Sequence, residues 1–181
     1  MIRRNNRVKH QWIVMLLWAP VVLLQVPSSF AHALFDRPPT RVMIHSPEST
    51  EGLRNRTTIT VVVPEDAGNA LGSIVLRQLP NPDQWDWGRL EPRLYLGDYS
   101  LRGKGTIGLA SAVVSEAEED LTIQFNPAIE PGQTVNVVFR GFNPQASIYQ
   151  WSTELRADGE DPIRYLGPTL RLAVYEQDPF R

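Results

Sequence analysis

Apolar and polar residues alternate with a period of two along most of the chain that follows residue 33. Leu121, Ile123 and Phe125, for example, alternate with three polar residues. Because successive side chains of a strand point to opposite faces, this pattern predicts β-strands that bury one face and expose the other to water. The clearest such runs are 58–63, 121–126, 134–140, 149–155 and 170–174, and the weaker ones are 41–45, 73–79 and 106–114.

Prolines and glycines separate these runs, at 64–68, 127–132, 141–144 and 158–162. Short strands divided by turn signals are typical of two antiparallel sheets packed face to face. The sequence therefore predicts an all-β fold, an antiparallel immunoglobulin-like β-sandwich of about seven or eight strands. Short helical turns are expected at 65–71 and 112–120.

The first 33 residues have the layout of a secretory signal peptide. Four basic residues precede an apolar run from Trp12 to Val26, and small residues follow, ending in Ala31-His32-Ala33. The apolar run is shorter than the roughly 17–25 residues of a membrane-spanning helix, which disfavours an uncleaved anchor. We expect cleavage after Ala33, with a cut after Ala31 as the alternative. The remaining domain, 34–181, would then have no transmembrane span and be exported to the periplasm, the cell envelope or the medium.

Removal of this segment changes the charge of the chain. The full chain has a net charge of −2, and the part after residue 33 keeps 14 basic and 20 acidic residues, or about −6. A nucleic-acid-binding protein would need clustered positive charge, so no nucleic-acid partner is expected. The chain has no cysteine, and a domain of this length can bury a core without disulfides.

Several motifs resemble a domain-of-unknown-function family of small exported proteins found mainly in cyanobacteria. The Pro-Glu-x-Ala-Gly motif lies at 64–68, and the Pro-Gly-x-Thr-Val motif lies at 131–135. Pro38-Pro39, Asn143-Pro144 and Tyr165-Leu166-Gly167 extend the resemblance over Phe35 to about Tyr175. The resemblance implies an exported protein and a β fold. It implies no catalytic residues, because the family has no established activity.

Four aromatic residues fall in the irregular segment 80–105: Trp85, Trp87, Tyr95 and Tyr99. Trp85 and Trp87 would project from one face of a strand. If exposed, they would form a platform for stacking sugar rings or a contact patch for a protein. The alternative is that they pack inside the end of the sandwich, since tryptophan is usually well buried. These four residues form the candidate binding patch.

Two histidines suggest a copper site as an alternative. Cleavage after Ala31 would make His32 the amino-terminal residue, whose amine and imidazole are good copper ligands, and His45 could add another. A calcium site at the acidic residues 116–120 is less well supported, because no calcium-binding loop motif surrounds them. No cofactor is predicted.

Catalysis finds little support in the sequence. Serine-hydrolase, zinc-protease and phosphate-loop motifs are missing, and any chain with 20 acidic residues offers carboxylate pairs. The favoured function is thus an exported non-catalytic binding or envelope-associated module with an unknown protein or glycan partner. An exported copper-binding protein and a two-carboxylate hydrolase acting on glycans are the alternatives.

Overall fold

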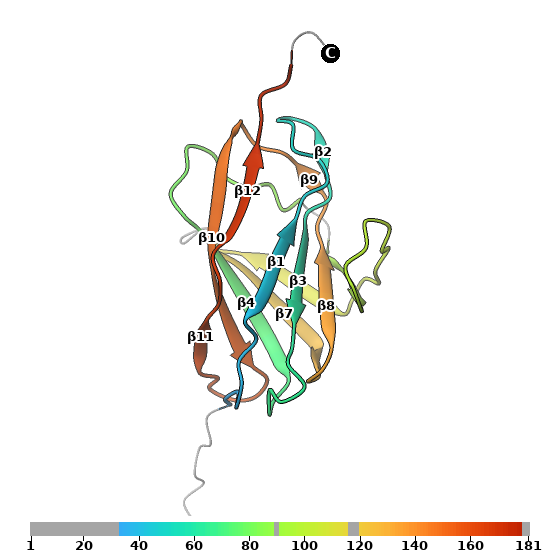
Figure 1. Cartoon of the computed structure of the whole chain (residues 1–181), viewed down its shortest axis with the longest axis vertical. Helices are drawn as coiled ribbons and strands as arrows, with labels where there is room; N and C mark the ends of the chain where they lie inside the picture. The colour runs from blue at the N-terminus through green and yellow to red at the C-terminus, as the bar shows by residue number, and fades with distance from the viewer. Residues whose placement is uncertain (1–32, 89–90, 116–119, 179–181) are drawn as a thin grey trace, which may run out of the picture. The chain divides into compact units, whose positions relative to one another are not determined.

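The computed structural model describes residues 33–88, 91–115 and 120–178, and these ranges form two antiparallel sheets and a small ribbon (Figure 1). The predicted all-β sandwich is confirmed, but the described residues form twelve strands in place of the seven or eight expected, because several of the strands are too short to show a period. One sheet has the order β1 (Arg41–His45), β3 (Thr58–Val62), β8 (Thr134–Val138), β5 (Arg93–Leu96). The other has the order β11 (Arg164–Leu166), β10 (Ser147–Ala157), β4 (Leu71–Gln78), β7 (Asp120–Ile129), β6 (Ala110–Val114), and β12 (Leu170–Val174) also pairs with β10. The ribbon joins β2 (Arg54–Asn55) and β9 (Gly141–Phe142).

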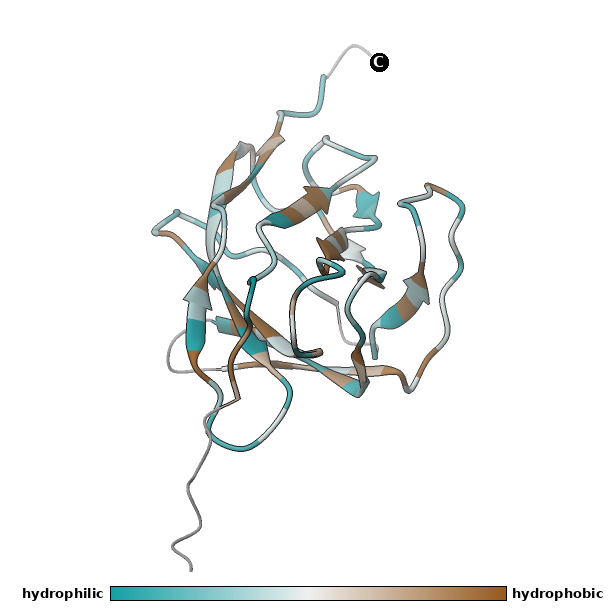
Figure 2. Ribbon diagram, turned by 60° about the horizontal axis from the view of Figure 1, so that its bottom comes forward, coloured by the Kyte–Doolittle hydropathy of each residue, from teal (hydrophilic) through white to brown (hydrophobic). Residues whose placement is uncertain are grey.

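The core lies between the two sheets. Ile59 and Val61 of β3 are fully buried, as are Tyr149, Trp151 and Leu155 of β10. Figure 2 shows hydrophobic and hydrophilic residues alternating along several strands. The period-two alternation read from the sequence therefore identifies the inward face of these strands correctly.

The outer face of the four-stranded sheet departs from the expected exposure. Thr58 and Thr60 of β3 are buried, and Thr60 Oγ1 donates a hydrogen bond of 2.7 Å to Asn136 Oδ1. Asn136 Nδ2 in turn donates to the carbonyl of Gly97 at 2.7 Å. The loop that follows β5 thus covers the centre of this face, and the polar side chains beneath it are satisfied by one another.

Two local expectations are wrong. The described residues contain no helix: 64–70 forms a turn with Gly68 at φ 73°, and 112–114 belongs to β6. Pro127 does not end its strand, because β7 continues to Ile129 through a cis Asn126–Pro127 peptide. The proline is tolerated because the β4–β7 register shifts at this point and leaves the ladder irregular.

The segment 33–36 is built into the sandwich next to β11. Phe35 is buried, its ring lies 5.3 Å from that of Tyr165, and its amide donates to the Tyr165 hydroxyl at 3.1 Å. Ile163 N donates to the carbonyl of Ala33 at 3.0 Å, and Asp36 N donates to that of Ala67 at 2.9 Å. The start of the domain is therefore fixed by hydrogen bonds to the turn at Ala67 and to Ile163 and Tyr165, which are near the other end of the chain.

Within the described ranges, no helix is long and apolar enough to cross a membrane.

Candidate functional site

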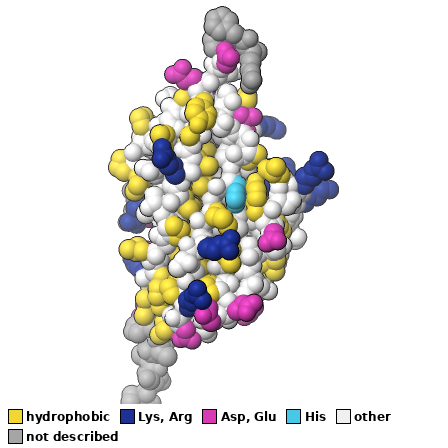
Figure 3. Space-filling model, in the orientation of Figure 1, with side chains coloured by type: hydrophobic (Ala, Val, Ile, Leu, Met, Phe, Trp, Pro, Cys, Tyr) yellow, Lys and Arg dark blue, Asp and Glu magenta, His cyan; other side chains and the backbone are white. Residues whose placement is uncertain are grey.

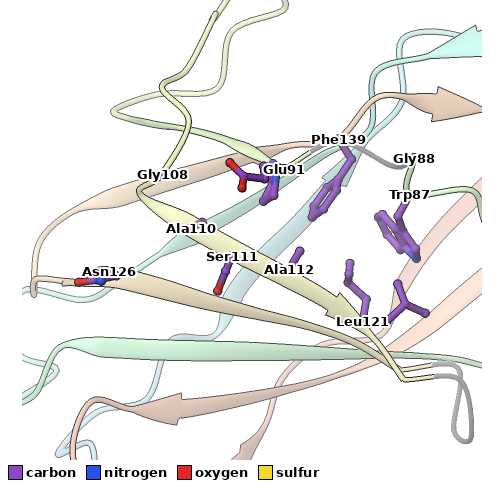
Figure 4. Close-up of a pocket in the computed structure, with 12 residues that line it drawn as sticks. Trp87, Gly88, Glu91, Gly108, Ala110, Ser111, Ala112, Leu121, Asn126 and Phe139 are labelled. Carbon is purple, nitrogen blue, oxygen red and sulfur yellow. The ribbon is translucent and has the colours of Figure 1, made fainter.

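A cavity of about 490 Å³ lies where the two sheets separate beside β5 and β6. Both are the last strands of their sheets, although a bridge between Leu94 and Thr106 partly covers the outer edge of β5. Figure 4 shows Trp87 and Phe139 on one side of the cavity, facing Ala112 and Leu121 on the other. This volume is in the range of sites that bind small molecules or one to a few side chains.

An aromatic cluster forms the wall of the cavity on the side of the four-stranded sheet. The Trp87 ring lies 5.2 Å from that of Phe139 and 5.8 Å from that of Trp151, both in edge-to-face arrangements. Trp85 packs behind it, 5.4 Å from Trp151, and donates from Nε1 to Thr57 Oγ1 at 3.1 Å. Rings packed in this geometry hold each other in place, so this wall of the cavity is preformed.

The opposite wall is the edge strand β6. Asn126 N donates to the Leu109 carbonyl, and Ser115 N donates to the Asp120 carbonyl, at the two ends of the β6–β7 pairing. Because hydrogen-bonded pairs alternate in an antiparallel ladder, the backbone groups of Ala110, Ala112 and Val114 point away from β7. No strand of the described ranges pairs with that side of β6. The edge is thus open to a further strand.

The side chains of β6 add an apolar character to this edge. Val113 is 66% exposed and Val114 is 48% exposed, which is unusual for an edge strand. Ala110 and Ala112 are small and allow another backbone to approach the cavity. Glu91 is the one ionisable side chain among the described lining residues, so the cavity combines apolar and polar lining residues with a single negative charge.

Trp85 and Trp87 do not form the stacking platform that the sequence suggested. They are only 5% and 8% exposed, because Tyr149 and Trp151 of β10 and Phe139 after β8 surround them. Both tryptophans pack inside the sandwich, which is the alternative that the sequence left open. The tryptophans support the cavity wall instead of offering their faces to a sugar ring.

Tyr95 and Tyr99 lie apart from the tryptophans, on the outer face of the four-stranded sheet. Leu94 is buried toward the core, so strand alternation places the Tyr95 side chain on the opposite face. The Tyr95 hydroxyl accepts a hydrogen bond from Ser100 N at 3.0 Å, and Tyr99 stacks on His45. The four aromatic residues of the predicted patch are therefore not brought together.

His45, the candidate copper ligand, is stacked against the ring of Tyr99. The two rings are 3.7 Å apart and 11° from parallel, and His45 Nε2 is buried without a hydrogen-bond partner. Figure 3 shows the histidine (cyan) bordered by hydrophobic side chains. Burial lowers the pKa of His45 below its ordinary value of 6.5. This nitrogen is not accessible to an ion at the surface.

The other candidate ligands are only partly within the described residues. His32, Glu116, Glu118 and Glu119 lie outside them. Asp120 forms a salt bridge of 2.6 Å with Arg77, its cross-strand partner in β4. No group of three or more histidine, aspartate or glutamate side chains within the described part is placed to hold a metal ion.

Sequence reasoning missed β6 as a candidate site. The available signal was the pair Val113-Val114 at the end of a weakly alternating run, where both faces of a strand would be apolar. Such a run does not distinguish an edge strand from a central one, since a strand at the centre of a sheet can also have apolar residues on both faces. The order of strands, which the sequence does not reveal, makes β6 an edge.

Comparisons with solved structures give distant likenesses. An uncharacterised Nocardia farcinica protein with an immunoglobulin-like fold is 17% identical, with 74% of this chain and 96% of that one covered and a TM-score of 0.47. The collagen-binding subdomain ACE19 of the Enterococcus faecalis surface protein ACE is 10% identical, with 76% and 99% covered and a TM-score of 0.45. A collagen-binding domain from a Staphylococcus aureus adhesin is 10% identical, with 74% and 96% covered and a TM-score of 0.37.

No curated protein sequence matches the chain. A family model does match, over residues 32–173, and its description is "Protein of unknown function (DUF2808)". The matched range contains all the strands except for the last residue of β12, Val174. The chain belongs to the DUF2808 family of proteins of unknown function.

Proposed function

We propose that this protein is an exported, non-catalytic binding module that accepts an extended segment of a partner protein along β6. The partner segment adds as a further strand to the six-stranded sheet and places one apolar side chain in the cavity beside it. The observation that carries the proposal is that the backbone groups of β6, which pair with no strand of the described residues, lie beside a preformed cavity with an aromatic wall. Strand addition of this kind derives affinity from backbone hydrogen bonds and specificity from side-chain pockets.

The lining residues define the partner's chemistry. Trp87, Phe139 and Leu121 favour an apolar or aromatic side chain, and alternate residues of an added strand would point to the same face. Glu91 at the cavity favours a lysine or arginine nearby in the segment. A two-carboxylate hydrolase is not supported at this cavity, because the described lining residues supply one carboxylate.

The charge and apolar pattern of residues 1–33 supports export, and the same pattern supports an address in the periplasm or the cell envelope. Mass spectrometry of the protein recovered from the medium and from envelope fractions tests this part of the proposal. Recovery of the full-length chain from the cytoplasm alone would contradict it.

The binding proposal is tested with a display library of random peptides about ten residues long, the upper end of common strand lengths. Selected peptides are expected to alternate apolar and polar residues and to carry a basic residue. Titration calorimetry then compares the wild type with Ala112→Trp, which fills the cavity, and with Ala173→Trp in β12 as the matched control. Ala112→Trp is expected to lower affinity by about tenfold or more, because a displaced anchor side chain dominates such interfaces.

Glu91→Gln provides a second variant that changes no volume. It is expected to weaken binding of peptides with a lysine and to leave neutral peptides unchanged. Equal binding by the wild type and both variants would overturn the proposal. Sedimentation showing a dimer that Ala112→Trp dissociates would also overturn it, because a second copy would then occupy β6.

A further inference from the structure

The β2–β9 ribbon presents an unusual set of side chains on one face. Arg54 pairs with Phe142, and Asn55 pairs with Gly141. Side chains alternate along strands, and directly opposed residues share a face. Arg56 and Arg140, on the side of the ribbon toward the four-stranded sheet, therefore project with Arg54 and Phe142. All four line one pocket of about 580 Å³, together with Pro47 and Glu48 among others.

The other face of the ribbon is fixed to the body of the domain. Asn55 and Asn143 are buried, and Asn55 Nδ2 donates to Asn143 Oδ1 at 2.6 Å. Asn143 Nδ2 donates to the carbonyls of Glu48 and Thr50. The Asp86 carboxylate accepts a hydrogen bond from Phe142 N at 2.9 Å. The pocket therefore rests on a satisfied polar network, which fixes the backbone from which the exposed side chains project.

The three arginines of the pocket form no salt bridge within the described residues. The Arg54 guanidinium lies 5.6 Å from the centre of the Phe142 ring, and Arg56 donates to the carbonyls of Leu101 and Gly103. Glu48 lines the same pocket, but its Oε1 accepts the amides of Ser49 and Thr50. Like charges that oppose one another on a ribbon are destabilising. An anion bound in the pocket would therefore relieve the repulsion between the arginines.

We propose that this pocket binds an acidic sugar, with the carboxylate held by Arg54 and Arg140, a hydroxyl group donating to Glu48, and the ring packed on Phe142. A guanidinium stacked on an aromatic face keeps its in-plane N–H groups free, and these match a carboxylate as a pair of donors. The amides of Thr50 and Ser49 lower the pKa of Glu48, which stays ionised as a hydroxyl acceptor.

Glu48 also distinguishes a carboxylate from a phosphate. A negative side chain in the pocket opposes a dianion more strongly than a monoanion, and its free oxygen suits a ligand that carries hydroxyl groups. The exposed Phe142 ring offers an apolar surface to the C–H face of a sugar, which an inorganic anion cannot use. The pocket shares no lining residue with the cavity at β6, so the two sites are tested separately.

The test is calorimetric titration of the protein, expressed from its full sequence, with a galacturonate oligosaccharide and with its fully methyl-esterified form. The ester keeps the shape and removes the charge. Arg140→Gln and Arg54→Gln are compared with Arg171→Gln, which removes the same charge from an exposed position of β12. Loss of one charge-assisted contact is expected to weaken galacturonate binding by about tenfold in the first two variants. Arg171→Gln is expected to bind as the wild type.

Thermal unfolding confirms that each variant is folded, and Ala112→Trp is expected to bind galacturonate normally. Equal affinity for the acid and its ester would overturn the proposal, as would equal affinity of Arg140→Gln and Arg171→Gln. Complete displacement of galacturonate by an equal concentration of inorganic sulfate would do so too, since the pocket would then hold any anion. A variant that no longer binds peptides at β6 is still expected to bind galacturonate at the ribbon. The failure of the peptide-binding proposal and the failure of the sugar-binding proposal can therefore be told apart.

Discussion

His45 illustrates how one side chain connects burial with pH. It stacks on Tyr99 and buries Nε2 without a partner, and the uncharged ring suits this environment. Burial lowers the pKa of His45 from 6.5 in the folded protein, so the unfolded chain binds its proton more readily. The stability that this histidine contributes is therefore complete above pH 6.5 and is lost as the pH falls below that value.

We predict that the wild type loses more stability between about pH 7.5 and pH 5 than His45→Phe does, since the phenylalanine keeps the stacked ring and cannot titrate. Urea unfolding at both pH values measures the difference. Parallel losses in the two proteins would show that carboxylates alone cause the acid sensitivity.

Asn143 has a different role, because its side chain joins three segments by hydrogen bonds to Asn55, Glu48 and Thr50. Asn143→Ala removes all three hydrogen bonds from a buried position and is expected to lower the free energy of unfolding by about 2 kcal/mol. Asn69→Ala serves as the control, because it removes a half-buried side chain whose hydrogen bonds are to the Asp158 carbonyl and from the neighbouring Ala70 N. A smaller effect for Asn143→Ala than for Asn69→Ala would contradict the account of the network.

At the scale of elements, the β2–β9 ribbon depends on close approach to the segment 83–88. A Cβ atom at Gly141 would lie 2.1 Å from the carbonyl oxygen of Asp86. Gly141→Ala should therefore displace the ribbon and destabilise the protein by about 1–3 kcal/mol. It should also weaken galacturonate binding, since Phe142 N would lose the Asp86 carboxylate.

Chemical denaturation and the galacturonate titration check both effects of Gly141→Ala. Gln145→Ala, at an exposed position just after the ribbon, is the matched control and is expected to change neither. Unaltered galacturonate affinity in a destabilised Gly141→Ala protein would separate the ribbon from the proposed sugar site.

The sequence predicted the long strands well and the short ones poorly. Alternation over five or more residues located β1, β3, β10 and β12 closely, since each buries one face in the core. The strands β2, β5, β9 and β11 have only two to four residues, too few to show a period. Their positions depend on tertiary contacts, which local patterns do not contain.

The candidate residues show the same limit. The sequence identified Trp85 and Trp87 as notable, but their burial is decided by Tyr149 and Trp151, which are distant in the chain. The arginines of the ribbon were missed, because Arg54 and Arg140 meet only through a pairing of two short strands. Side-chain type could be read from the sequence, but proximity could not.

At the scale of the whole molecule, the docking of residues 33–36 bears on where a signal peptide would be cut. A start at Leu34, the site expected from the sequence, removes Ala33, which is buried and accepts a hydrogen bond from Ile163 N. A start at His32 keeps both contacts. We therefore predict that the exported form begins at His32, and that its mass exceeds that of a chain beginning at Leu34 by one histidine and one alanine.

Intact-mass measurement of exported protein decides between these starts. A chain produced to begin at Leu34 is also expected to unfold at a lower temperature than one that begins at His32. An exported protein that begins at Leu34 would show that the Ala33 contacts are dispensable.

The pairing of Phe35 with Tyr165 also constrains the order of folding. The two residues are 130 positions apart, and synthesis delivers Phe35 long before the tyrosine that covers it. The packing of the segment that holds Phe35 is therefore complete only after the last part of the chain has been made, and folding rates fall as such distant contacts dominate. A nascent chain halted before Arg164 leaves the Phe35 ring uncovered. A chaperone that recognises exposed aromatic residues would therefore have the longest time to bind at the amino-terminal end of the domain.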